Sequence, residues 1–299
     1  MDAISPSNAR QTTVDVVENV AVARDTYRLR LESPNLARAI RPGQFLMVRP
    51  AHGGSPLLGR PFAVYDVPRS ADGAATAVDL VYLIVGPGTQ ALARLRPGDR
   101  VVTWGPLGNG FGAGPGADRS VVFVAGGIGQ TPFLALGKWW LGLDRYGEAP
   151  GTGPTRTARA ATLLYGVRSG DLAAGLGDFV AAGIDVELAT DDGSAGHHGF
   201  VTDLLARRLE RGDRPARVVG CGPPAMLAAV ARLTARHGVD CDVSLENHMA
   251  CGFGACYSCV APIRQPDGTT DLRRVCLEGP VFAAGAVAWP TAKVDESLG

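Results

Sequence analysis

The first hundred residues alternate short apolar runs with turn signals. Five runs are rich in β-branched and aromatic residues, and they read TTVDVVENV, TYRLRLE, QFLMVRP, PFAVYDV and VDLVYLIV. Clusters of proline, glycine, asparagine and aspartate separate them, as at 41–43, 71–73 and 96–99. Short strands at this regular spacing are typical of an antiparallel β-barrel.

The pattern changes after residue 120, where strand signals and helix signals alternate. The strand-like runs read SVVFVA, ATLLYGV, IDVELAT and ARVVGCG. The helix-like stretches between and after them include FLALGKWWLGL, DLAAGLGDFVAAG, FVTDLLARRLER and PAMLAAVARLTARHG. This alternation predicts βαβ units around a parallel sheet.

The chain is therefore predicted to fold as several domains of β and α/β class. At 299 residues it is long enough for two or three of them. We expect a β-barrel at 1–112, a Rossmann-like parallel-sheet domain at 113–240 and a small domain at 241–299, which has too few apolar residues for a core of its own. Two Gly- and Pro-rich stretches, 111–118 and 146–159, are expected to be a linker and a surface insert.

Composition and charge narrow the possible partners. Hydrophobic residues make up 46% of the chain and the formal net charge is zero, so we expect neither a nucleic acid nor an anionic membrane as a partner. No apolar run reaches the ~18 residues that span a bilayer. The polar N-terminal stretch lacks the features of a signal peptide, so a cytoplasmic location is expected. In that reducing compartment, six cysteines favour metal binding over disulfides.

Four of the cysteines have an informative spacing. They follow the pattern C-x4-C-x2-C, then sixteen residues, then C, and they are Cys251, Cys256, Cys259 and Cys276. This is the spacing of a plant-type [2Fe-2S] site, in which four thiolates hold two irons. Gly252 and Gly254 would permit tight turns there and let backbone N–H groups approach the sulfides. A zinc site, disulfides and buried thiols are the alternatives, although zinc sites usually use two separated cysteine pairs.

Two turns at strand ends suggest a dinucleotide site. The Gly-rich turn at 126–132 follows a strand and precedes a helix. Free backbone N–H groups at such a helix N-terminus can bind a pyrophosphate. It is not the usual dinucleotide fingerprint, and an ordinary strand–helix turn is the alternative. Cys221-Gly222-Pro223 occupies the equivalent place after a later strand. A small thiol there could contact a nicotinamide, and a buried cysteine in a tight turn is an equal alternative.

Two further signals lie in the barrel region. Arg60, at the entrance to a strand, could hold a phosphate as a bidentate donor. The turn at 86–89 offers a close backbone approach and a hydroxyl group. Each signal is weak alone, but the pair is informative in a barrel that precedes a dinucleotide domain.

The order of barrel, RPFAVY, GPGT, GGIGQTPF and CGP resembles the ferredoxin-NADP reductase superfamily. With the cysteine loop LENHMACGFGACYSCV and the ending RRVCLEGPVF, residues 12–290 look closely like the electron-transfer subunits of bacterial two-subunit dihydroorotate dehydrogenases. The resemblance implies FAD in the barrel, NAD(H) in the α/β domain and a [2Fe-2S] cluster in the C-terminal domain. It also implies a partner, an FMN-containing catalytic subunit that oxidises dihydroorotate in pyrimidine (UMP) biosynthesis, with two copies of each subunit in a heterotetramer.

The resemblance also implies roles for individual residues. The family's flavin-binding RPxS stretch corresponds to Arg60, Pro61, Phe62 and Ala63, where alanine replaces the usual serine. Its second flavin stretch corresponds to Tyr82, Leu83, Ile84, Gly88, Thr89 and Gln90. Its dinucleotide turn corresponds to Gly127, Gly129 and Thr131. The family's position near the nicotinamide corresponds to Cys221, Gly222 and Pro223. Its cluster ligands correspond to the four spaced cysteines. No catalytic acid or base is expected, because the cofactors carry the chemistry.

Two other functions stay open on the sequence. One is a related NAD(P)H-linked flavin and iron-sulfur reductase subunit that serves a hydrogenase- or ferredoxin-type acceptor. The other is a non-enzymatic zinc-binding module, which would carry no flavin. Arg168-Ser169 could bind a 2′-phosphate and favour NADP, but a solvated loop is the preferred interpretation. His197-His198 is expected to lie in a polar loop, because adjacent histidines rarely converge on one ion.

Overall fold

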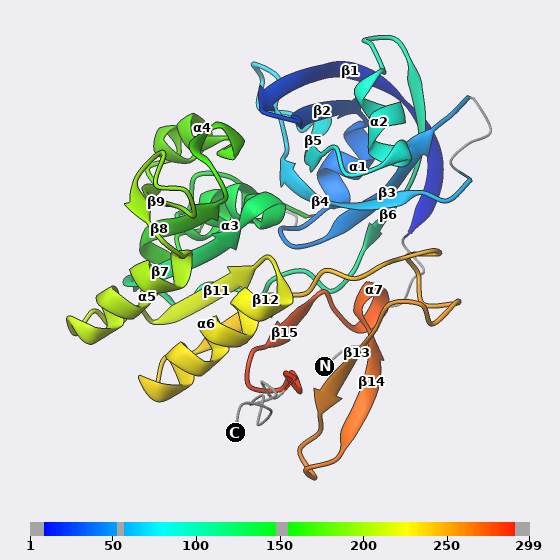
Figure 1. Cartoon of the computed structure of the whole chain (residues 1–299). Coiled ribbons are helices and arrows are strands. Elements are labelled where there is room, and N and C mark those ends of the chain that lie inside the picture. Colours follow the sequence, from blue (N-terminus) through cyan, green and yellow to red (C-terminus); the bar gives the residue numbers. More distant parts are fainter. Residues whose placement is uncertain (1–8, 53–56, 148–154, 291–299) are drawn as a thin grey trace.

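Six antiparallel strands close a barrel in the first part of the chain. The computed structural model describes residues 9–52, 57–147 and 155–290. The barrel order is β1-β2-β5-β4-β3-β6, formed by β1 (Arg10–Ala23), β2 (Thr26–Glu32), β3 (Phe45–Pro50), β4 (Arg60–Asp66), β5 (Ala77–Leu83) and β6 (Arg100–Leu107). Two short helices accompany it, α1 (Pro34–Ala39) and α2 (Pro87–Ala93). The predicted barrel is confirmed, and β6 completes the five predicted runs (Figure 1).

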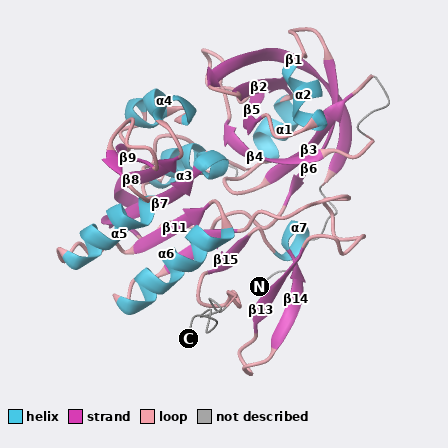
Figure 2. Ribbon diagram, viewed as in Figure 1, coloured by secondary structure: helices cyan, strands magenta, loops and turns pink. Residues whose placement is uncertain are grey.

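A seven-stranded sheet follows, with the order β10-β9-β8-β7-β11-β12-β15. Its strands are β7 (Gly116–Gly126), β8 (Ala158–Val167), β9 (Asp185–Thr190), β10 (His197–His198), β11 (Arg217–Cys221), β12 (Cys241–Ser244) and β15 (Val281–Ala283). Its helices are η2 (Gly127–Gln130), α3 (Phe133–Trp140), η3 (Gly170–Leu172), α4 (Leu176–Ala181), α5 (Val201–Glu210) and α6 (Pro224–Arg236). All neighbouring strands are parallel except β15, which confirms the predicted parallel α/β architecture (Figure 2).

The cysteine segment lies between two strands of this sheet. After β12 the chain runs through the cysteine loop into a hairpin of β13 (Val260–Arg264) and β14 (Thr270–Arg274), then into the short helix α7 (Val275–Glu278). It returns to the sheet as β15, which pairs with β12. The sheet therefore extends beyond residue 240 and holds both ends of the cysteine segment.

A shared apolar core joins the barrel to the α/β sheet. Tyr65 and Val81 of the barrel belong to the same buried cluster as Phe123, Phe133 and Trp140 of the α/β layer. The rings of Phe123 and Phe133 are stacked with centroids 5.0 Å apart. The two parts therefore bury apolar surface against each other, which fixes their relative placement.

Polar contacts reinforce this junction. The Asp66 carboxylate of β4 accepts hydrogen bonds from Lys138 Nζ of α3 at 2.5 Å and from the Tyr146 hydroxyl at 3.0 Å. Tyr146 is buried, so the predicted insert at 146–159 begins inside the structure, while residues 148–154 lie outside the described residues. The neighbouring Tyr65 hydroxyl donates to Asp178 at 2.7 Å.

We expect Asp66→Ala to destabilise the protein by about 2 kcal/mol or more, because it leaves an ammonium group and a hydroxyl without their acceptor in a half-buried place. Urea unfolding would measure the loss. The matched control is Asp171→Ala, which breaks an exposed ion pair with Arg24 (2.9 Å; both side chains more than half exposed) and should cost less than about 1 kcal/mol. Equal losses in the two variants would contradict the inference that the Asp66 contacts hold the junction.

Within the parts of the chain that the structure describes, every helix is too short or too polar to cross a membrane.

Candidate cofactor sites

Arg60 lies beside the start of α2. A Cβ atom added to Gly88 would stand 3.2 Å from Arg60 Nε, so the two predicted flavin stretches meet here. The Arg60 guanidinium donates only to the backbone carbonyls of Leu58 (3.1 Å) and Gly59 (3.2 Å), and it faces no carboxylate among the described residues. A half-buried guanidinium without an anionic partner is suited to bind a phosphate group.

Thr89 shapes the turn that precedes α2. Its hydroxyl oxygen accepts hydrogen bonds from the backbone N–H groups of Val85 (2.9 Å) and Gly86 (3.2 Å), and its proton goes to the Gly86 carbonyl (3.1 Å). The hydroxyl is therefore occupied within the turn. What this turn offers to a ligand is mainly the backbone around the buried Gly88, next to Arg60.

The side chain of Tyr82 belongs to the barrel core. It is 1% exposed, its ring lies 5.6 Å from that of Phe62, and its hydroxyl donates to Asn19 Oδ1 at 3.1 Å. Because side chains alternate along a strand, its neighbour Leu83 points the other way and is half-buried. Tyr82 and Phe62 could therefore contact a flavin only through their backbone atoms. Their assignment as flavin-binding residues stays a prediction.

The other predicted flavin residues lie along the same stretches. Half-buried positions are Pro61, Ala63 and Ile84, while Gln90 is exposed on α2. Ala63 has no polar side-chain atom, so the structure supplies no hydroxyl at the position of the family's serine.

The two predicted dinucleotide turns touch each other. β7 and β11 are parallel neighbours, with Ala125 opposite Cys221, so both turns emerge at the carboxyl edge of the sheet. A Cβ atom on Gly129 would stand 2.3 Å from the Cys221 carbonyl oxygen, and one on Gly222 would stand 2.9 Å from the Gly126 nitrogen. This edge is where open α/β sheets bind their ligands. The structure thereby gathers Gly127, Gly129, Thr131, Cys221, Gly222 and Pro223.

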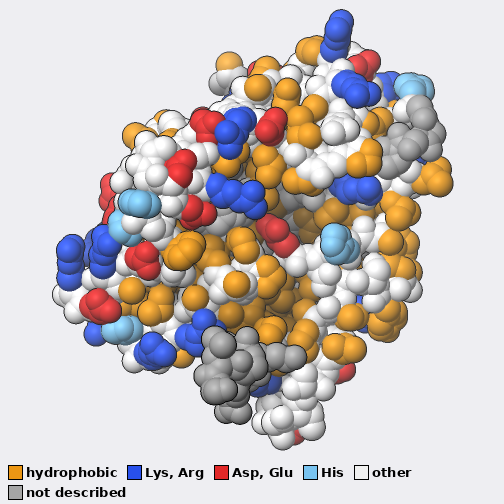
Figure 3. All heavy atoms as spheres, viewed as in Figure 1, with side chains coloured by type: hydrophobic (Ala, Val, Ile, Leu, Met, Phe, Trp, Pro, Cys, Tyr) orange, Lys and Arg blue, Asp and Glu red, His pale blue; other side chains and the backbone are white. Residues whose placement is uncertain are grey.

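The helix after the Gly-rich turn starts where the sequence predicts it. The 3-10 turn η2 comes first, with the Thr131 N–H donating to the Ile128 carbonyl, and α3 begins at Phe133. η2 also contacts β5, so this turn lies at the junction with the barrel. Figure 3 shows a hollow where the parts of the molecule meet, bordered by hydrophobic side chains and charges of both signs.

The four spaced cysteines form two neighbouring pairs. Hydrogen bonds from Ser258, with a smaller contribution from Cys251, lower the pKa of Cys256 to about 6. Burial and the adjacent Cys259 raise the pKa of Cys276, and Cys251 contributes to this rise. Among the described residues, no three cysteine, histidine or acidic side chains converge where one metal ion could bind.

This donor set fits a two-iron cluster. Four soft thiolates hold such a cluster, with one pair of thiolates at each of its two ends. A backbone hydrogen bond from Gly254 also reaches Cys276 and lowers its pKa, as expected where N–H groups approach cluster sulfur. We therefore infer that Cys251, Cys256, Cys259 and Cys276 would hold a [2Fe-2S] cluster.

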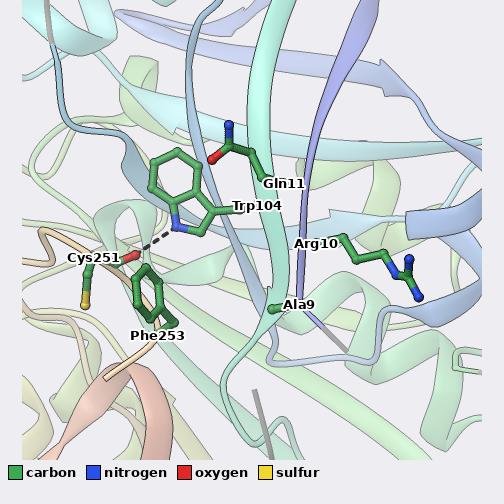
Figure 4. Close-up of a pocket in the computed structure, with 6 residues that line it drawn as sticks. All are labelled: Ala9, Arg10, Gln11, Trp104, Cys251 and Phe253. Carbon is green, nitrogen blue, oxygen red and sulfur yellow. Dashed lines mark hydrogen bonds between the residues drawn. The ribbon is translucent and has the colours of Figure 1, made fainter. Parts of the chain in front are cut away.

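The cysteine loop takes its shape from its glycines and from the barrel. Gly252 (φ 80°) and Gly254 (φ 89°) have positive φ, and a Cβ on Gly252 would stand 2.5 Å from Met47 of β3. The Trp104 indole of β6 donates to the Cys251 carbonyl at 2.8 Å, as Figure 4 shows. Phe253 lies beside this contact and lines a pocket together with Ala9, Arg10, Gln11, Trp104 and Cys251.

Arg274 also supports the loop. Its guanidinium donates to the Gly254 carbonyl at 3.2 Å and lies over the ring of Tyr257, 4.8 Å from the centroid. Sequence reasoning assigned no role to Trp104 or Arg274. Arg274 belongs to the RRVC motif, which was a usable signal, whereas nothing near Trp104 in the sequence points to a residue 147 positions away.

Comparisons with known proteins agree with this geometry. The family model described as the iron-sulfur cluster binding domain of dihydroorotate dehydrogenase B matches residues 246–288. A dihydroorotate dehydrogenase B (NAD(+)) electron transfer subunit from Desulforamulus reducens is 35% identical over 268 residues, covering 90% of this chain and 94% of the relative. The subunit of the same name from Fusobacterium nucleatum is 32% identical over 274 residues, covering 91% and 96%.

Solved structures show the same architecture. A structure of the NADH-dependent reduced ferredoxin-NADP oxidoreductase has a TM-score of 0.74 at 26% identity, covering 92% of this chain and 90% of that chain. A cytochrome P450 reductase from Amycolatopsis has a TM-score of 0.59 at 26% identity, covering 77% and 66%. With relatives matched over nearly their whole length and the four-cysteine loop in place, this chain belongs to the family of dihydroorotate dehydrogenase B electron transfer subunits.

Proposed function

We propose that this chain passes electrons between NAD(H), FAD and a [2Fe-2S] cluster, to or from an FMN-containing dihydroorotate dehydrogenase subunit in pyrimidine biosynthesis. When bound, the flavin exchanges hydride with the nicotinamide and the cluster carries single electrons. The observation that carries the proposal is the four-thiol loop fixed against both the barrel and the α/β sheet. The chain's own residues bind and orient the cofactors, and no acid or base is assigned.

We propose that the FAD phosphates bind beside Arg60 and Gly88, and that the isoalloxazine ring lies along the ends of β4 and β5. The nicotinamide end of NAD(H) would then enter between the turns of Gly129 and Cys221. NAD(H) rather than NADP(H) is supported by Ser169, whose hydroxyl donates to Asp171 at 2.6 Å and accepts from Arg24. The Asp171 carboxylate is also paired with Arg24 at 2.9 Å, so neither the Ser169 hydroxyl nor this guanidinium is free to bind a 2′-phosphate.

The exposed side of the cysteine loop is the proposed docking face for the catalytic subunit. Cys256 is exposed, and the adjacent Phe253 and Tyr257 are 46% and 60% exposed, respectively. Exposed aromatic side chains are enriched at protein interfaces. We propose a heterotetramer with two copies of each subunit, in which dihydroorotate contacts only the partner.

The domain limits and the location remain part of the proposal. We propose units at 1–112, 113–240 and 241–299, with the third held by β12 and β15 in the sheet of the second. A cytoplasmic location is supported by the cysteines, all six of which are free thiols.

A second candidate differs only in the acceptor. The likeness to the NADH-dependent reduced ferredoxin-NADP oxidoreductase structure supports a related reductase subunit that serves a ferredoxin-type acceptor. The two candidates predict the same cofactors, and reconstitution with the FMN-containing subunit would separate them.

The test of the proposed function is the visible absorption spectrum of anaerobically purified protein before and after addition of NADH. We expect flavin bands with a broad iron-sulfur shoulder, both bleached by NADH. A flat spectrum in folded protein that was isolated without loss of cofactor would overturn the proposal and favour a zinc-binding module.

A further inference from the structure

Trp104 of β6 holds the backbone of the first cysteine in the cysteine loop. Its indole Nε1–H donates to the Cys251 carbonyl at 2.8 Å, although the two residues lie 147 positions apart in the chain. In Figure 4 the Cys251 carbonyl points toward the indole, whereas the Cys251 sulfur points away from it. The barrel therefore grips this residue by its peptide group and leaves its thiol free to bind a metal.

The surroundings of the indole fix its orientation. A Cβ atom on Gly59 would stand 2.5 Å from Trp104 Cη2, so the ring lies directly against the backbone just before Arg60. Trp104 is half-buried and packs on the same apolar cluster as Cys259 and Cys276. The direction of the indole N–H is therefore set by packing as well as by its acceptor.

The backbone that Trp104 holds also reaches a second cysteine of the loop. A backbone hydrogen bond from Cys251 reaches the Cys256 sulfur and lowers the pKa of that thiol. On the next residue, a Cβ atom on Gly252 would stand 2.5 Å from Met47 of β3, so the barrel also limits how this part of the loop can shift. Cys251 thus has its carbonyl on Trp104 and its N–H on the sulfur of Cys256.

Hydrogen bonds to cysteine sulfur have an electronic effect in an iron-sulfur site. They are among the factors that set the reduction potential, because a positive N–H dipole stabilises the more negative, reduced state. Residues that orient such groups without contacting the metal tune metal sites in this way. A side chain that keeps an N–H directed at a cysteine sulfur therefore makes reduction more favourable.

Resting on the proposed function, we propose that Trp104 is a positioning residue for the [2Fe-2S] cluster. Its hydrogen bond to the Cys251 carbonyl keeps the Cys251 N–H directed at the Cys256 sulfur and thereby raises the reduction potential of the site. The indole acts through the backbone of the loop and contacts no thiol in this role.

A redox titration of the anaerobically purified, cofactor-loaded protein, followed by paramagnetic resonance, tests this role. The two variants are Trp104→Phe and Trp104→3-benzothienylalanine, in which a sulfur atom replaces the N–H group and the shape of the ring is kept. In the second variant we expect the cluster to be loaded and its reduction to be roughly tenfold less favourable, which is about 59 mV for one electron. Its flavin midpoint should stay as in the wild type.

The matched control is Trp289→Phe, which removes the indole hydrogen bond to the Ala284 carbonyl (2.9 Å) in the same apolar cluster and should leave the cluster midpoint unchanged. A wild-type midpoint in the benzothienylalanine variant would overturn the inference, because only the N–H group is lost there. An equal shift in Trp289→Phe would also overturn it and would indicate a general loosening of the core. Wild-type protein without any iron-sulfur signal would refute the proposed function itself, and this inference with it.

Discussion

Replacing Cys256 by serine is expected to abolish electron transfer to the catalytic subunit while leaving the flavin in place. Cys256 is the most exposed of the four thiols, and its hydrogen bonds with Ser258 lower its pKa to about 6, which favours the thiolate form that binds iron. A serine hydroxyl is similar in size but stays protonated near neutral pH and is a harder ligand than a thiolate. The loop should therefore keep its fold and lose its cluster.

Absorption and paramagnetic resonance spectra of the Cys256→Ser protein measure this outcome. The flavin bands should remain and still be bleached by NADH, while the iron-sulfur shoulder and the resonance of the reduced cluster disappear. Cys241→Ser, at a cysteine of β12 outside the loop, is the control and should keep the cluster. Dihydroorotate-dependent NAD⁺ reduction that survived in the assembled Cys256→Ser complex would show that electrons bypass the cluster.

The Gly129→Ala variant is expected to lose about 3 kcal/mol of stability and much of its dinucleotide affinity. The added Cβ would stand 2.3 Å from the Cys221 carbonyl oxygen and 2.8 Å from the Gly222 nitrogen. These are backbone atoms of β11 and its turn, so no side-chain rotation can relieve the clash. The two turns would be forced apart at the edge where we place the nicotinamide.

Urea unfolding and ADP-ribose titration measure the two effects. Gly177→Ala is the matched control, because this glycine lies in α4 and a Cβ there meets no atom within 4 Å. It should raise stability by roughly 0.5–1 kcal/mol. A Gly129→Ala protein as stable as wild type would mean that the turns are not packed as closely as the structure shows.

Local patterns in the sequence predicted the elements well. β-branched runs between turn signals anticipated five barrel strands, and the strand–helix alternation anticipated the parallel sheet. The His197-His198 segment, predicted as a polar loop, forms the edge strand β10 beside β9. The side of the strand on which a residue lies was harder to predict, as Tyr82 shows. Both faces of β5 carry apolar side chains, so the alternation along the strand does not reveal which face points into the barrel.

Contacts between distant segments could not be predicted from local patterns. The hydrogen bond from Trp104 to Cys251 and the one from Cys221 to Glu246 depend on which strands become neighbours. The sequence likewise gives no local sign that the chain after α7 returns to pair with β12. Such pairings are set by the order of strands in the folded sheet, which emerges only when the whole core is assembled.

The return of β15 to the sheet has a consequence for how this protein could be shortened or recombined. A chain cut just before the cysteine loop would leave β12 as an uncovered edge strand, open to pairing with other chains. Conversely, a loop grafted onto a different reductase would lack the two strands that hold its ends at a fixed spacing. We therefore expect the cysteine segment to keep its fold in another protein only when β12 and β15 are transferred with it.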